Sequence, residues 1–116
     1  ERTGIYSIIY SIQFSNAGSA IYDSDTWLRK NGGGTSGNVI NTNTRFSVIA
    51  KHGSIEGNIV GTVNYVLHVQ ANDYLELIWA TSNAQAYIHA EGVQTSPFDH
   101  PGIPGIICTV TQVASA

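Results

Sequence analysis

Apolar residues alternate with polar ones along several short runs of the chain, and this period of two predicts β-strands. The first run covers residues 5–14 and places Tyr6, Ile8, Tyr10, Ile12 and Phe14 on one face. Similar runs cover residues 20–30, 46–51, 59–71, 74–80, 86–90 and 106–113. Clusters of Gly, Asn, Ser and Asp separate the runs, as turns require. The sequence therefore predicts one all-β domain of about seven strands, arranged as a sandwich or barrel.

Two long polar stretches interrupt the strands. Residues 31–45 hold four glycines and four asparagines, and we expect a surface loop with a short strand around Val39 and Ile40. Residues 92–105 hold all three prolines. Loops on a rigid scaffold often carry binding residues, although both stretches also suit plain connectors. The candidate contact residues are Asn31, Asn38, Asn41, Asn43, Phe98, Asp99 and His100.

The composition narrows the possible partners. Charged residues make up 11% of the 116 residues, against about 25% in an average soluble domain. A neutral polar surface suits assemblies, because charge repulsion between neighbours is small. Five Lys and Arg residues in all leave no basic stripe for nucleic acid. No apolar stretch approaches the ~20 residues of a membrane-spanning helix, so we expect no membrane insertion.

Few residues suggest chemistry. No G-x-S-x-G motif occurs, and the paired carboxylates of a glycosidase could come only from Asp23, Asp25 and Glu76. Alternation puts Asp23 and Asp25 on one strand face, which is more typical of a solvated surface. The single cysteine, Cys108, cannot form an intrachain disulfide or a thiolate zinc cluster, and we expect it to be buried in its strand. We therefore predict no catalytic residue and no cofactor.

Histidine and tryptophan leave alternatives open. His89 stands close to Glu91, and the two could ligate a metal or form a hydrogen-bonded surface pair. Trp79 lies in an apolar run and is predicted to be in the core. Trp27 could pack in the core as well, or it could be a partly exposed platform on which a sugar stacks.

Three segments resemble one known family. They are GIYSIIYSIQF, LHVQANDYLELIW and GIICTVTQV, which are similar in order and spacing to strands of the complement globular-head and tumour-necrosis-factor-like jelly roll. The segments WLRKNG and TVTQV look closer to the phage virion versions found in tail fibres, fibre tips and capsid decorations. The resemblance covers nearly the whole chain.

The resemblance implies an antiparallel jelly roll of about seven to eight strands that assembles as a homotrimer. One sheet of each subunit would face the threefold axis, with the last strand packed centrally in it. The side chains facing the axis would be Ile5, Ser7, Ile9, Asn64, Val66, His68, Ile107 and Thr109. The residues themselves agree in part, because the three strands concerned are apolar on both faces and such strands are covered twice. A monomeric sandwich is the alternative.

His68 is the sharpest case in the predicted interface. Three copies could meet near the axis and bind a metal or an anion, or respond to pH. A histidine hydrogen-bonded in the interface is the simpler interpretation. His68 and His89 are thus the two weak metal candidates, and no metal site is predicted.

The chain departs from the family at its beginning, because the family has one or two strands before the Gly-Tyr strand. We expect residues 1–116 to be the C-terminal part of a longer protein, or to receive the missing edge from another chain.

The function expected is that of a non-enzymatic structural protein at the surface of a virus particle. It would be a fibre or spike head that binds a host receptor or glycan, or a capsid decoration that binds other virion proteins. The alternatives are a secreted complement-like or lectin-like binding module and a small jelly-roll enzyme.

Overall fold

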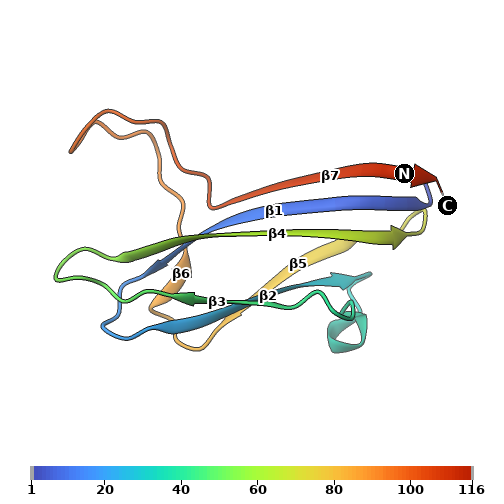
Figure 1. Cartoon of the computed structure of the whole chain (residues 1–116), viewed down its shortest axis with the longest axis horizontal. Coiled ribbons are helices and arrows are strands. Elements are labelled where there is room, and N and C mark those ends of the chain that lie inside the picture. The colour runs from blue at the N-terminus through green and yellow to red at the C-terminus, as the bar shows by residue number, and fades with distance from the viewer. Residues whose placement is uncertain (1, 116) are drawn as a thin grey trace.

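The computed structural model describes residues 2–115, which form two antiparallel sheets and contain no α-helix. The strands are β1 (Gly4–Asn16), β2 (Tyr22–Lys30), β3 (Thr44–Val48), β4 (Gly57–Val69), β5 (Leu75–Thr81), β6 (Ala86–Ile88) and β7 (Ile106–Ser115). One sheet has the order β4-β1-β6 with β7 also paired to β1, and the other has the order β3-β2-β5 (Figure 1). The predicted all-β sandwich is confirmed. No helix among these residues could span a membrane.

β1 is the central strand of the larger sheet. It pairs with β4 on one side along its whole length, and with β7 and β6 on the other. Its even-numbered apolar side chains point between the sheets, as the alternation predicts. They form the core cluster with Leu28 and Val48, and its members on β1 are Ile8, Tyr10, Ile12 and Phe14. Burying one such side chain stabilises the fold by about 1.5–3 kcal/mol.

β7 lies at the edge of its sheet, whereas the resemblance implied a central position. It pairs only with β1, and all ten of its residues are exposed. A central position would require a further strand beyond β7, and residues 2–115 supply none. A hollow of about 370 Å³ lies beside this edge, bounded by Tyr6, Leu75 and Val110 among others.

Two residues predicted to be buried are exposed as a result. Cys108 is exposed, although it pairs with Tyr10 and so points to the same side as the core. No strand of the opposite sheet contacts β7 extensively in the described part of the chain. Trp79 is 38% exposed, because β5 is likewise an edge strand.

The loop after β2 differs from the prediction in detail. No strand forms around Val39 and Ile40; a 3-10 turn (η1, Gly34–Gly37) stands in the loop, and Asn38 forms a single bridge to Arg29. Asn31 and Gly32 form a tight turn at the start of this loop, since both have positive φ, 57° and 65°, and the Gly33 amide donates to the Lys30 carbonyl at 3.5 Å.

Candidate functional site

The eight residues predicted to face a threefold axis lie on one face of the larger sheet. Residues that pair directly across antiparallel strands point to the same side. The pairs are Ile5 with His68, Ser7 with Val66, Ile9 with Asn64 and with Thr109, and Ser11 with Ile107. This side is opposite to the core side of β1. We call the surface formed by these eight residues the outer face.

The outer face is apolar and accessible along its middle. The exposed fractions are 40% for Ile9, 61% for Val66 and 55% for Ile107. Polar side chains between them bond to each other across the strands, with Ser7 Oγ donating to Asn64 Oδ1 at 3.3 Å. Ile9, Val66 and Ile107 lie on a diagonal across the three strands, with Asn64 and Thr109 directly beside Ile9, and apolar side chains exposed together on one sheet face mark interaction sites.

His68 stands on this face but forms no metal cluster. Within residues 2–115, no group of three His, Cys, Asp or Glu side chains is arranged to hold a metal ion. Any metal bound by His68 would need ligands from further copies of the chain.

Trp27 is partly buried on the outward side of the smaller sheet, so it is not a core residue. Its Nε1 donates to Asn38 Oδ1 at 2.9 Å, and Arg29 Nε donates to the same oxygen at 2.9 Å. Asn38 thus fixes the edge of the indole ring to the loop of residues 31–45. Alternation places Asp25 on the same strand face.

Asp25 sits beside this tryptophan in a fixed polar network. Arg45 donates to both of its carboxylate oxygens, from Nε at 2.7 Å and from Nη2 at 3.1 Å, and Asn43 Nδ2 donates at 3.1 Å. The hydrogen bonds from Arg45 hold the pKa of Asp25 below its ordinary value. The carboxylate is therefore ionised at neutral pH and accepts bonds from several directions.

Two shallow hollows meet at Trp27 and Asp25. One, of about 300 Å³, is also lined by Asn38, Asn41 and Asn43. The other, of about 360 Å³, is also lined by Asp23, Arg45 and Thr81. Both volumes lie at the lower end of the range usual for ligand clefts, about 300–1,000 Å³.

Asn31 has a structural role instead. Its Nδ2 donates to Asp73 Oδ1 at 3.0 Å, and its Oδ1 accepts from the Tyr74 amide at 2.9 Å. The bond from Asn31 is the main reason that the pKa of Asp73 is lowered. Asn31 therefore joins the β2 end to the turn before β5 and does not belong to the Trp27 hollows.

The proline-containing stretch forms an arm that projects from the sandwich at the end opposite to η1 (Figure 1). Its two sides are joined by backbone bridges between Glu91 and Ile103 and between Gln94 and His100. Phe98 at its tip is 66% exposed, and its ring lies 5.5 Å from the His100 ring. Asp99 is exposed as well. The two predicted contact loops are therefore not brought together.

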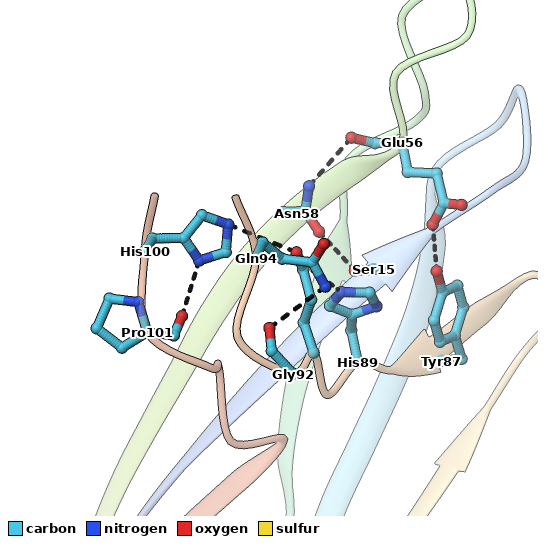
Figure 2. A network of polar contacts seen from close by, with 10 residues as sticks. Ser15, Glu56, Asn58, Tyr87, His89, Gly92, Gln94, His100 and Pro101 are labelled. Atoms are coloured by element: carbon cyan, nitrogen blue, oxygen red, sulfur yellow. Dashed lines mark hydrogen bonds and ion pairs between the residues drawn. The ribbon is translucent and has the colours of Figure 1, made fainter. Parts of the chain in front are cut away.

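A polar network joins the base of the arm to the sheet (Figure 2). Glu91 contacts His89 Nε2 at 3.2 Å and His100 Nε2 at 3.6 Å, while His100 Nδ1 donates to the Pro101 carbonyl at 2.7 Å. Tyr87 donates to Glu56 nearby, and this bond raises the pKa of the Tyr87 phenol. His89 and Glu91 thus form a hydrogen-bonded pair at the base of the arm.

Comparison of the chain with protein-family models, with curated proteins and with solved structures found no match. The outer face, the Trp27 hollows and the arm are therefore the features of the molecule that bear on its function.

Sequence reasoning identified the members of the Trp27 site separately and missed that they converge. Arg45 was not recognised, and Asp25 was interpreted as part of a solvated face. The available signal was the alternation along β2, which already places Asp23, Asp25 and Trp27 on one side. The sequence does not show that the loop of residues 31–45 folds back over that side of β2.

Proposed function

We propose that this protein is a non-enzymatic structural module of a virus particle, a jelly-roll subunit that assembles as a homotrimer through its outer face. The observation that carries the proposal is the exposed apolar strip formed by Ile9, Val66 and Ile107. It lies on one side of three neighbouring strands whose other side, at β1, builds the core. None of the eight outer-face residues is an acid, a lysine or an arginine, so copies can pack there without burying unpaired charges of these kinds.

The extent of the surface supports assembly. The accessible area is 7096 Å², whereas a compact monomer of this mass exposes about 6,100 Å². The radius of gyration is 16.6 Å, against about 13 Å for a compact chain of this length. The excess of about 1,000 Å² is comparable to the ~800 Å² that each partner buries in a standard interface.

The strand order supports the jelly-roll part of the proposal. The chain passes from one sheet to the other between β1 and β2, again between β3 and β4, and on both sides of β5. Such repeated crossing is typical of Greek-key sandwiches and jelly rolls.

Light scattering tests the oligomeric part. At tens of micromolar we expect three times the 12.4 kDa mass of one chain. A mass of one chain at that concentration would contradict the trimer.

Immunogold electron microscopy tests the location. An antibody against the chain should label intact particles purified from a culture that produces the protein. Label confined to the cell envelope or the medium would favour the second candidate, a secreted lectin-like module. The Trp27 hollows are the observation that favours this second candidate, since an aromatic ring among amides and a carboxylate suits sugar binding.

A further inference from the structure

We propose that the paired hollows around Trp27 form a binding site for a neutral glycan. This inference goes beyond the proposed structural function and adds a ligand site with a stated ligand class. It concerns the smaller sheet and not the outer face, so it does not require the trimer.

The indole ring of Trp27 is placed to stack on a sugar. Trp27 borders both hollows, and its Nε1 is already bonded to Asn38. The indole is therefore held in one orientation before a ligand arrives, which reduces the entropy lost on binding. The negative face of an aromatic ring attracts the slightly positive C–H edges of an apolar surface, and one face of a pyranose ring presents such C–H groups.

The polar groups around the Trp27 ring include both hydrogen-bond acceptors and donors. Sugar hydroxyls both donate and accept hydrogen bonds, so a sugar site needs acceptors and donors together. The Asp25 carboxylate already accepts three hydrogen bonds, which leaves about one of its roughly four acceptor positions for a ligand, while the side-chain amides of Asn41 and Asn43 supply both kinds of group. Asn43 uses its Nδ2 for Asp25, which leaves its Oδ1 as an acceptor.

The charged side chains around Trp27 disfavour an acidic ligand. Arg45 forms a bidentate pair with Asp25, and Asp23 borders the same hollow. The arginine charge is therefore already compensated, and a further carboxylate or sulfate on the ligand would lie beside two acids. These groups favour an uncharged hexose or N-acetylhexosamine over a sialic or uronic acid.

A glycan array carrying neutral, sialylated and uronic-acid oligosaccharides tests the proposal with the full chain. We expect binding to neutral glycans and little binding to acidic ones. The best neutral oligosaccharide is then titrated against the Trp79→Phe variant, in which Trp27 is the remaining tryptophan. Its fluorescence should change on binding, because the ligand covers the indole.

Two variants and one control locate the site. Trp27→Ala should weaken binding by roughly 5- to 150-fold, the range expected when stacking on an aromatic ring is lost. Asn41→Gly should weaken it about tenfold; Asn41 has φ of 63°, which glycine adopts without strain, so this variant keeps the proposal testable if Trp27→Ala does not fold. Trp79→Ala is the matched control, and its affinity should not change.

Three results would overturn the inference: no binding to neutral glycans on the array, affinity unchanged in Asn41→Gly and folded Trp27→Ala, or preference for acidic glycans. Light scattering of the same samples separates this failure from failure of the proposed function. A trimer that binds no neutral glycan refutes the glycan site alone, and a monomer that binds one refutes the trimer alone.

Discussion

The core leaves no room for a side chain at Gly61. A Cβ at this position would stand 2.6 Å from Cε1 of Phe46, and Phe46 in turn packs on Phe14 with ring centroids 5.3 Å apart. A rigid ring held on its other side cannot move away at low cost. Gly61 thus allows β4 and β3 of opposite sheets to approach closely.

We expect Gly61→Ala to lower the free energy of unfolding by about 1–3 kcal/mol, the usual cost of overpacking. Urea denaturation measures the change. Gly92→Ala is the control, since no atom lies within 4 Å of the Cβ it would add, and its effect should stay within about 0.5 kcal/mol. Equal stability of Gly61→Ala and the unchanged chain would show that Phe46 can shift.

Tyr10 should make the fold sensitive to alkali. Burial, only partly offset by the hydrogen bond to Thr26, raises the pKa of Tyr10 to about 12, above the ~10 of an unfolded tyrosine. Below pH 10 both states are protonated, so stability is unaffected. Above it the unfolded state loses its proton first, and stability falls as pH rises towards 12.

Melting temperatures at pH 8 and pH 11 check this prediction. Tyr10→Phe should show a smaller alkaline loss, although it is less stable at pH 8 because Thr26 loses a buried partner 2.9 Å away. Thr26→Val removes the same hydrogen bond and keeps the phenol, so its alkaline loss should remain. If Tyr10→Phe lost as much stability between pH 8 and pH 11 as the unchanged chain, other titrating groups would be responsible for the alkaline loss.

Among the strands, β7 is the least supported, because all ten of its residues are exposed and, in the described part of the chain, β1 is the one strand that contacts it extensively. Open edges readily pair with a further strand. The thiol of Cys108 reports on this region, since it is exposed on the side of β7 that faces away from the outer face.

We expect Cys108 in the folded chain to react with a maleimide nearly as fast as in urea, because no described element covers it. Mass spectrometry follows the reaction. The reference is Val48→Cys in a Cys108→Ser background, which should react far more slowly, since Val48 is 0% exposed. Protection of Cys108 in the folded chain would contradict this and reveal a strand or partner along β7.

The sequence was enough to predict where strands form along the chain. It was not enough to predict where each strand lies within its sheet. Alternation located all seven strands and the buried side of β1, because a period of two fixes which side chains share a face. Alternation alone did not give the eight residues of the outer face, which came from the family resemblance; the β1–β4 and β1–β7 registers place them on one side of the sheet. Alternation failed for Cys108 and Trp79, since an apolar residue in a strand is buried only if the opposite sheet extends over it. It failed for Asp25 and Arg45 because their pairing depends on the β2–β3 register.

At the scale of the whole molecule, the proposed trimer requires that other copies of the chain cover the outer face. Val66→Asp would place a carboxylate in the centre of the proposed interface, where three copies would repel each other and lose their hydration. We expect the mass in light scattering to fall to that of one chain at the same concentration. Ile55→Asp is the control, since Ile55 is 71% exposed in the link before β4. A trimer that persists in Val66→Asp with unchanged melting would exclude this face as the interface.

The first and last strands run side by side, and Gly4 pairs with Ser115. β1 therefore begins, and β7 ends, at the same pole of the molecule, while the arm stands at the other pole (Figure 1). A linker of a few residues could join these two ends, and the chain could be reopened at the tip of the arm near Phe98. Such a circular permutant would keep every strand pairing, because exposed loop tips tolerate new termini.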